Sequence, residues 1–295
     1  MDTYRVHRID SLELPELAPY RTLKRPAAHE TEGIFVAESD KVVRRLLTSH
    51  YGVISVMLPE KRLAEFEPLL RARPEKEIPV YVVTQKSLLE ELVGFDLFQG
   101  VLAIGKIPPP VALETILADS PRPRLFAAVD ELSNAENIGA FVRNCAAFGV
   151  QALIVGETCS SPFLRRSVRN SMGTIFQLPV FEVSQQRGKL ADPARPRRRN
   201  EPGLTLVETL HDLRAHGVQC IAAHPHASGK TLEQANFTGD CCLIFGSEGH
   251  GISPAVLAAC AEAVAIPMAN GVDSLNVGAA AAVFFYEAQR QRGKS

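Results

Sequence analysis

The sequence predicts an α/β fold, with a small N-terminal α/β domain before a larger domain that has a mostly parallel sheet. Short, nearly continuous apolar runs of strand length recur from residue 125 onward, as is typical of strands covered on both faces. Helical patterns separate these runs, which favours right-handed β-α-β units. Three consecutive prolines, Pro108 to Pro110, divide this part from the residues before it, because proline lacks an N–H and fixes φ.

Residues 1–106 alternate between strand-like and helical patterns after a Pro-rich lead-in of mixed charge. Strands are predicted at 32–39, 52–59 and 78–84, and an amphipathic helix is predicted at 41–48. We therefore expect three parts in the chain: a small α/β domain at 1–106, a Pro-rich linker at 107–123 and a second domain at 124–295.

Five apolar runs predict the strands of the second domain, at 125–130, 151–156, 218–223, 241–246 and 263–267. Helices are predicted at 138–148, 204–216, 254–261 and 277–286. The helix at 277–286 is apolar on nearly every face, which requires burial on all sides. One face of a sheet cannot bury it completely, so we expect a homodimer in which this helix lies between two copies of the chain.

The stretch 185–203 breaks the α/β pattern. It holds six basic residues and two acidic ones without apolar periodicity, and we expect a flexible basic loop. Such a loop is either a solvated insertion or a contact for RNA phosphates. The sequence leaves both possibilities open.

Composition excludes several classes of protein. The formal net charge is −1, so no long-range positive field attracts nucleic acid, and RNA binding must use local patches. The six cysteines lack C-x-x-C spacing and favour reduced, buried thiols in a cytoplasmic protein. No apolar run approaches the ~18 residues of a membrane span. His224-Pro225-His226 has no acidic or cysteine partner at ligand spacing, so we expect no metal.

Three separated segments carry the chemistry: 134–149, 243–253 and 266–287. Each begins at the end of a predicted strand, passes through a loop rich in Gly, Asn and Ser, and enters a predicted helix. Because ligands of open α/β sheets bind beyond the carboxyl ends of the strands, we expect these loops to form one composite pocket. Asn137 is expected to cap the helix that starts at Ile138.

Two familiar enzyme classes fit this pattern poorly. The glycines at 246, 249 and 251 have the spacing G-x-x-G-x-G, whereas the dinucleotide fingerprint is G-x-G-x-x-G in the first β-α turn of its domain. A hydrolase that uses Ser247 and His250 would be expected to show the G-x-S-x-G elbow, which Ser247 lacks.

Together, the segments resemble the SpoU class of RNA ribose 2′-O-methyltransferases in the α/β-knot (SPOUT) superfamily. The matching motifs are Asn134 to Arg143, Phe245 to Gly251, and Ile266 to Met268 with Ser274 to Val277. Residues 32–47 and 98–105 also resemble the ribosomal-protein-like substrate-binding domain of these enzymes. The resemblance implies a C-terminal α/β-knot, the cofactor S-adenosylmethionine, an rRNA or tRNA substrate, and a dimer through the last helix.

The resemblance also implies the site residues. Active-site positions correspond to Asn134, Arg143, Glu248, Ser274 and Asn276, and cofactor-binding positions to Gly246, Gly251, Ile266, Met268 and Leu275. Basic residues at Lys24, Arg25, Arg165, Arg166 and Arg169 are candidate RNA-phosphate contacts, with solvated surface charge as the alternative for each. Two departures concern the placement of the substrate: Ala135-Glu136 replaces the usual Pro-Gly, and Gly278 stands where Ser is common.

The implied reaction needs a ribose 2′-oxygen aligned behind the donor methyl group. Arg143 would act as an electrostatic clamp on the phosphate and the developing alkoxide, with a role as the base left open. Ser274 and Asn276 would orient the hydroxyl. A knot-fold RNA-binding or ribosome-assembly protein without catalysis is the alternative, and the retained Arg143, Glu248, Ser274 and Asn276 argue against it.

Overall fold

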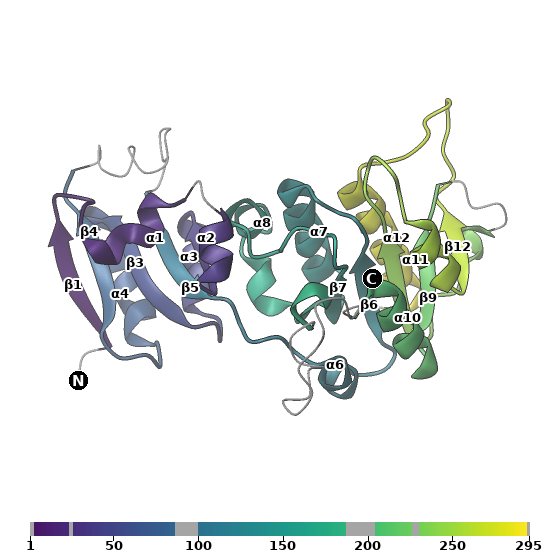
Figure 1. Ribbon diagram of the computed structural model, residues 1–295, viewed down its shortest axis with the longest axis horizontal. Helices are drawn as coiled ribbons and strands as arrows, with labels where there is room; N and C mark the ends of the chain where they lie inside the picture. The colour runs from purple at the N-terminus through teal and green to yellow at the C-terminus, as the bar shows by residue number, and fades with distance from the viewer. Residues whose placement is uncertain (1–2, 24–25, 86–99, 187–203, 226–229, 294–295) are drawn as a thin grey trace, which may run out of the picture. The chain divides into compact units, whose positions relative to one another are not determined.

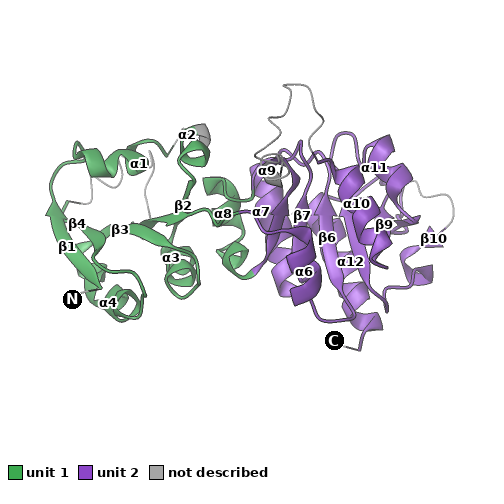
Figure 2. Cartoon of the chain, turned by 60° about the horizontal axis from the view of Figure 1, so that its bottom comes forward, with its two compact units in different colours: residues 1–109, 162–177 green, residues 110–161, 178–295 purple. Residues whose placement is uncertain are grey.

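The computed structural model describes residues 3–23, 26–85, 100–186, 204–225 and 230–293 (Figure 1). The chain divides into two compact units: residues 1–109 with 162–177, and residues 110–161 with 178–295 (Figure 2). Lys24, Arg25, His226 and residues 187–203 of the predicted basic loop lie outside the described residues.

Unit 1 contains a five-stranded mixed sheet in the order β1-β4-β3-β5-β2. Its strands are β1 (Tyr4–Ile9), β2 (Ile34–Glu38), β3 (Val53–Pro59), β4 (Ile78–Val83) and β5 (Leu102–Lys106). Its helices are α1 (Ala18–Arg21), α2 (Pro26–Thr31), α3 (Asp40–Leu47), α4 (Leu63–Arg71) and α8 (Arg165–Asn170), with short 3-10 turns at Pro15–Leu17, Glu60–Arg62 and Thr174–Gln177. The predicted strands and the helix at 41–48 are confirmed, and Val42, Val43, Leu46 and Leu47 of α3 are buried as its spacing predicts.

Strand β1 was not predicted. It lies at the edge of the sheet, parallel to β4, and its sequence YRVHRI mixes basic and apolar side chains instead of forming an apolar run. Arg5 pairs with Glu77 and Arg8 pairs with Glu60, and all four side chains are exposed. Charged side chains of this kind are common on edge strands because they discourage pairing with another chain.

Residues 162–177 pack on the sheet of unit 1. Helix α8 lies against β2, and Phe163 and Phe176 contact the ring of Phe35 with centroids 5.9 and 5.3 Å apart. The Glu38 side chain is buried and accepts from Arg165 Nε at 2.7 Å and from Arg169 Nη1 at 3.1 Å. Two of the arginines considered for RNA phosphate therefore hold this segment on β2.

Replacing Glu38 by Ala is expected to lower the free energy of unfolding by about 3 kcal/mol, because it leaves the largely buried guanidinium of Arg165 without its carboxylate. The midpoint and slope of urea unfolding measure this change. Glu32→Ala, an exposed carboxylate near the start of β2, is the control and is expected to change stability by less than about 0.5 kcal/mol. Equal stability of the two variants would contradict the assigned role of Glu38.

Unit 2 contains a seven-stranded sheet in the order β10-β12-β9-β11-β6-β7-β8, and every pairing in it is parallel. The strands are β6 (Leu125–Val129), β7 (Ala152–Val155), β8 (Val180–Glu182), β9 (Gln219–Ala223), β10 (Lys230–Thr231), β11 (Cys241–Phe245) and β12 (Glu262–Ala265). The five predicted strands and the parallel sheet are confirmed. The two that were not predicted, β8 and β10, are the short edge strands.

Helices cover both faces of this sheet. One face carries α6 (Leu113–Asp119), α10 (Leu206–Ala215) and α11 (Pro254–Ala259), whose buried side chains share a core with Phe126, Ile154 and Ile244. The other carries α7 (Ala135–Ala147) and α12 (Val277–Gln291), which meet over Phe245. Helix α9 (Val183–Gln186) and a 3-10 turn at Leu232–Gln234 complete the elements.

Helix α6 falls within the predicted linker 107–123. Leu113, Ile116 and Leu117 are spaced along one face of this helix and are buried in the core of unit 2. The three prolines that interrupt the α/β pattern, Pro108 to Pro110, end before α6 begins. The division between the two units falls between Pro109 and Pro110.

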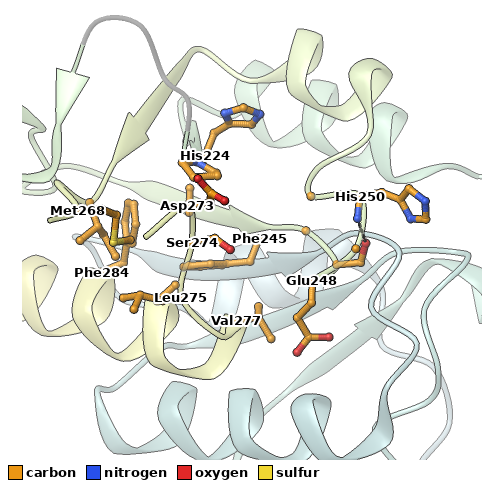
Figure 3. A pocket seen from close by; sticks show the side chains of 18 of the residues that line it. His224, Phe245, Glu248, His250, Met268, Asp273, Ser274, Leu275, Val277 and Phe284 are labelled. Atoms are coloured by element: carbon orange, nitrogen blue, oxygen red, sulfur yellow. Dashed lines mark hydrogen bonds between the residues drawn. The ribbon is translucent and has the colours of Figure 1, made fainter. Parts of the chain in front are cut away.

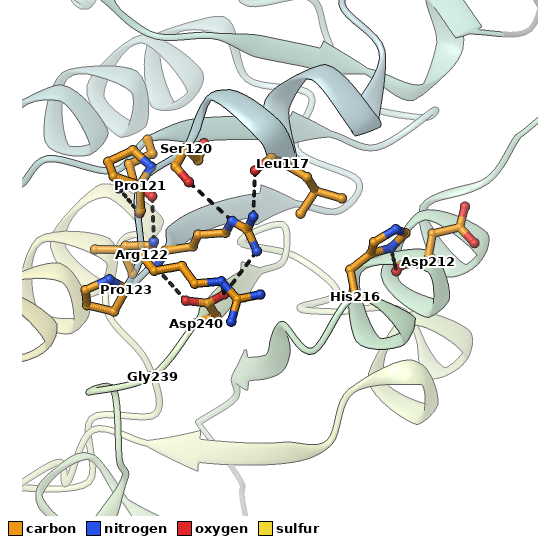
Figure 4. Close-up of polar contacts among 12 residues, drawn as sticks. Leu117, Ser120, Pro121, Arg122, Pro123, Asp212, His216, Gly239 and Asp240 are labelled. Atoms are coloured by element: carbon orange, nitrogen blue, oxygen red, sulfur yellow. Dashed lines mark hydrogen bonds and ion pairs between the residues drawn. The ribbon is translucent and has the colours of Figure 1, made fainter.

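The C-terminal end of α12 is tied to the beginnings of the two central strands. Arg292, which caps the helix, donates to the carbonyls of Pro123 and Arg124 before β6 and of Phe237 and Gly239 before β11. Beside these groups the Asp240 carboxylate accepts from the Arg124 backbone and pairs with its guanidinium (Figure 4). The last helix is therefore anchored far from β12, the strand that precedes it.

Candidate active site

A cavity of about 280 Å³ lies at the carboxyl edge of the parallel sheet in unit 2 (Figure 3). The loop after β11, the segment between β12 and α12, and the residues that follow β9 line it. Phe245, Met268, Leu275, Val277 and Phe284 form an apolar part of its wall. The predicted meeting of distant loops at this edge is thus present for the second and third segments.

Gly246 is the tightest point of the loop after β11. A Cβ atom at this position would lie 2.0 Å from the carbonyl carbon and 2.1 Å from the oxygen of Gly251. The loop closes on itself, since Ser247 N–H donates to Gly251 O at 3.0 Å and Gly251 N–H donates to Ser247 O at 2.9 Å. Gly251 has a φ of +70°, which a residue with a side chain rarely adopts. The two glycines fix the rim of the cavity.

The segment between β12 and α12 is shaped by a tight turn. Asn270 and Gly271 have φ values of +56° and +70°, and Val272 N–H donates to Ala269 O at 3.2 Å. Positive φ at both central residues is the type I′ geometry that Asn-Gly favours. The turn carries the chain back along the cavity, where Ser274 and Leu275 line it before α12 begins.

Helix α7 begins one turn earlier than its sequence suggests. Asn134 is the N-cap, and its Oδ1 accepts from the backbone N–H groups of Glu136 and Asn137. The prediction that Asn137 caps this helix is wrong, because both residues are good caps and the sequence does not distinguish them. Asn137, within the first turn, is free to use its side chain elsewhere.

The three motif segments meet in a cluster of three side chains, which we call the clasp: Asn137, Glu248 and Asn276. Asn276 Nδ2 donates to Asn137 Oδ1 at 3.2 Å and to Glu248 Oε1 at 3.1 Å, and Asn137 Nδ2 also donates to Glu248 Oε1. Asn276 Oδ1 accepts from Gly278 N–H at 2.9 Å and so caps α12. The clasp joins α7, the loop after β11 and α12 on one side of the cavity.

Close packing of α7 on α12 holds the clasp in place. Asn144 Nδ2 donates to Gly278 O at 2.6 Å, and a Cβ at Gly278 would lie 3.5 Å from the Ala140 Cβ. The ring of Phe141 packs on Phe245, with centroids 5.1 Å apart. Gly278, one of the two departures from the family pattern, lies where the two helices come together.

The cavity brings together most of the predicted site residues. Those that line it are Gly246, Glu248, Gly251, Ile266, Met268, Ser274 and Leu275. Asn276 joins them through Glu248, whereas Asn134 and Arg143 are absent from the lining. Arg143 is exposed on α7 and makes no hydrogen bond or ion pair within the described part of the chain. Of the remaining RNA candidates, Arg166 is exposed.

Sequence reasoning missed Asn137 as a member of the site and gave no cofactor role to other polar residues of the cavity, namely His224, Ser247, His250 and Asp273. Their positions just after strands β9, β11 and β12 are the signal that could have found them. The Ser247 hydroxyl accepts from the backbone N–H of His250 at 3.3 Å, which is a turn contact. Among the described residues no group of three His, Cys, Asp or Glu could hold a metal ion.

The cysteines carry no chemistry at this site. All six are free, and burial raises the pKa of the Cys159 and Cys260 thiols to about 12. Thiols of this kind behave as small apolar groups.

No helix within the described ranges is long and apolar enough to cross a membrane.

A profile of the SpoU rRNA methylase family matches residues 124–195 and 202–286, more than half of the chain. The chain belongs to this family. An uncharacterized tRNA/rRNA methyltransferase of Synechocystis sp. is 35% identical over 300 residues, which cover 98% of this chain and 96% of that protein. The 23S rRNA (guanosine-2′-O-)-methyltransferase of Acinetobacter baylyi is 27% identical, with 82% of this chain and 97% of that protein covered.

A solved structure shows the same fold. The AdoMet-bound rRNA methyltransferase of Sinorhizobium meliloti matches with a TM-score of 0.74 and 20% identity over 97% of this chain and 98% of that chain. The predicted fold class, an α/β-knot domain after a small α/β domain, is confirmed. Membership of the SpoU family also identifies the chain as a methyltransferase, and the methyl donor bound in the Sinorhizobium meliloti structure is S-adenosylmethionine (AdoMet).

The cavity fits this donor. Its apolar wall of Phe245, Leu275 and Phe284 is suited to a nucleoside base, and the close approach of Gly246 to the backbone of Gly251 keeps the loop after β11 tight at the rim. Serine and carboxylate groups on the rim provide partners for the polar parts of the donor. That Gly246, Gly251, Ile266, Met268 and Leu275 contact the cofactor stays a prediction.

Proposed function

We propose that this protein is a cytoplasmic RNA ribose 2′-O-methyltransferase that transfers the methyl group of S-adenosylmethionine to a 2′-hydroxyl of rRNA or tRNA. The observation that carries the proposal is the clasp beside the cavity, which unites polar side chains of all three motif segments at the rim of an apolar slot. The name of the Acinetobacter baylyi relative, a guanosine-2′-O-methyltransferase of 23S rRNA, supports the ribose as acceptor.

The residues of the chain would act by binding, orienting and stabilising. S-adenosylmethionine supplies an electrophilic methyl group when it is bound. The apolar wall and the loop after β11 hold the donor, and Ser274 directs a hydroxyl toward it. Arg143, exposed on the neighbouring helix α7, stabilises the charge of a bound phosphate and of the developing alkoxide.

Arg143→Ala is expected to reduce kcat for transfer of tritiated methyl groups to RNA by about 100-fold or more, since charge stabilisation of this kind contributes about 2.7–4 kcal/mol. Its Kd for S-adenosylmethionine, measured by calorimetry, is expected to stay near that of the unchanged protein because Arg143 does not line the cavity. Arg122→Ala, another exposed arginine of unit 2 that lies outside α12, serves as the control. Full turnover by Arg143→Ala would argue against the assignment.

We also propose that two copies pair through α12. In a single chain this helix is buried on one face only, whereas the apolar side chains of Ala279, Val283 and Tyr286 are exposed, Tyr286 by 55%. Their spacing of four and three residues makes one stripe along the helix. A second copy of the same stripe is a natural cover, since symmetric dimers use one surface twice.

A knot-fold RNA-binding protein without catalysis is the second candidate. No feature of the described cavity favours it, because the active-site residues are retained and a scaffold protein needs no cavity for a methyl donor. Calorimetry with S-adenosylmethionine separates the two candidates, since a scaffold need not bind the donor.

A further inference from the structure

The reaction needs a group that accepts the proton of the ribose hydroxyl, and the clasp suggests which group this is. Arg143 remains protonated in proteins and is poorly suited to the task. Two carboxylates line the cavity, Glu248 and Asp273. Asp273 is exposed and makes no hydrogen bond or ion pair within the described ranges, whereas Glu248 is held by side chains from two other motif segments.

The two hydrogen bonds that Glu248 accepts in the clasp reach the same carboxylate oxygen. Asn137 Nδ2 and Asn276 Nδ2 both donate to Oε1, and no residue in the described part of the chain donates to Oε2. The clasp therefore fixes the direction of the carboxylate and leaves one oxygen available at the rim of the cavity. Figure 3 shows Glu248 next to Val277, the first residue of α12.

The two asparagines are committed to this task. Asn276 uses its Oδ1 to accept from Gly278 N–H and its Nδ2 to donate to Asn137 and Glu248. Asn137 uses its Oδ1 for Asn276 and its Nδ2 for Glu248. Both N–H groups of Asn276 Nδ2 are engaged in the protein, so this amide cannot donate to a substrate hydroxyl without breaking a contact. Asn276 thus fits a positioning role better than the direct contact with the hydroxyl expected from the sequence.

We propose that Glu248 accepts the proton of the ribose 2′-hydroxyl through Oε2, and that Asn137 and Asn276 are positioning residues that act through Glu248. This inference rests on the proposed function. The proton moves from the hydroxyl to the carboxylate, the ribose oxygen bonds to the methyl carbon, and the carbon–sulfur bond breaks with its electron pair going to the sulfur. The carboxylate then releases the proton to water, to which its exposed position gives access.

Glu248→Gln tests the proposal with little change in shape. The amide oxygen of the new side chain can still accept from both asparagines, but its NH₂ group cannot accept a proton. We expect kcat to fall by about 100-fold or more, the usual range for loss of a general base, with less than a threefold change in Kd for S-adenosylmethionine by calorimetry. Glu114→Gln on α6, an exposed carboxylate on the opposite face of the sheet, is the matched control.

Chemical rescue distinguishes proton transfer from a structural role. Added formate is expected to raise the kcat of Glu248→Ala at least tenfold, because a small carboxylate can occupy the vacated position. Asn137→Ala is expected to lose about tenfold in kcat, and much less when it is combined with Glu248→Gln, since residues that act as a unit are not additive.

Two results would overturn the proposal: a kcat of Glu248→Gln within threefold of the unchanged protein, or a loss of kcat matched by an equal rise in the cofactor Kd without rescue by formate. In both cases the unchanged protein still methylates ribose, and the proposed function stands. Transfer by the unchanged protein to no RNA, or only to bases, would instead refute the proposed function and this inference with it.

Discussion

Gly246→Ala is expected to abolish measurable binding of S-adenosylmethionine. The new methyl group would lie 2.0 to 2.2 Å from three backbone atoms, the carbonyl carbon and oxygen of Gly251 and the nitrogen of Ile252. Backbone atoms cannot rotate away as the end of a side chain can, so the loop must open and lose the hydrogen bonds between Ser247 and Gly251. We expect Kd to rise by at least about 100-fold, or about 2.7 kcal/mol, in calorimetry.

Gly239→Ala provides the matched control for this change. It makes the same substitution in a loop of unit 2, but the added Cβ meets no atom within 4 Å, and φ there is not positive. Its cofactor affinity should equal that of the unchanged protein. Tight binding by Gly246→Ala would mean that the loop after β11 does not hold the donor.

Arg292→Ala is expected to cause a large loss of stability for a side chain that is only partly buried. Its guanidinium donates to four backbone carbonyls at 2.7 to 3.0 Å and contacts Cys241 Sγ at 3.3 Å. Hydrogen bonds from a charged donor contribute about 1.5–3 kcal/mol each where they are shielded from water, and this side chain is only half-buried. We therefore expect the free energy of unfolding to fall by about 3 kcal/mol in urea.

The neighbouring Arg290 offers the comparison for Arg292. It is exposed and pairs with Glu287 one turn earlier, an arrangement that contributes well under 1 kcal/mol. Arg290→Ala should leave the urea midpoint almost unchanged. If both substitutions shift the midpoint equally, the anchoring of α12 at the starts of β6 and β11 is not what stabilises the C-terminal end.

Most of the core could be predicted from the sequence. Central parallel strands are covered on both faces, and the resulting apolar runs, such as CCLIF at β11 and LFAAV at β6, stand out without knowledge of their partners. Edge strands lack this signal. Strand β1 mixes basic and apolar residues, β10 has two residues, and β8 has three. Helix α6 was hidden because it follows directly on a Pro-rich stretch.

The site was predictable at the level of loops and less so at the level of side chains. The position of each loop follows from the direction of its strand, which the apolar pattern gives. The clasp depends on contacts between residues that are separated by 111 and by 139 positions in the sequence, and no local pattern reveals such contacts. The choice between Asn134 and Asn137 depended on where α7 begins, which the sequence leaves uncertain by one turn.

The knot could be predicted only from the resemblance to the SpoU class. Local rules favour sheets whose connections do not thread one another, and knotted chains are rare exceptions. In the structure the segment after β12 returns across the sheet edge, so that α12 packs on α7 and β11 rather than beside β12. The apolar character of α12 could be read from the sequence, but its packing against α7 and β11 could not.

Alkaline hydrolysis of RNA methylated with a labelled donor tests the central claim most directly. Hydrolysis requires a free 2′-hydroxyl, so a methyl group on the ribose protects the following phosphodiester. We expect the label from the unchanged protein to appear in alkali-resistant dinucleotides, and we expect Gly246→Ala to transfer none. Label found in mononucleotides would place the methyl group on a base and would refute ribose 2′-O-methylation.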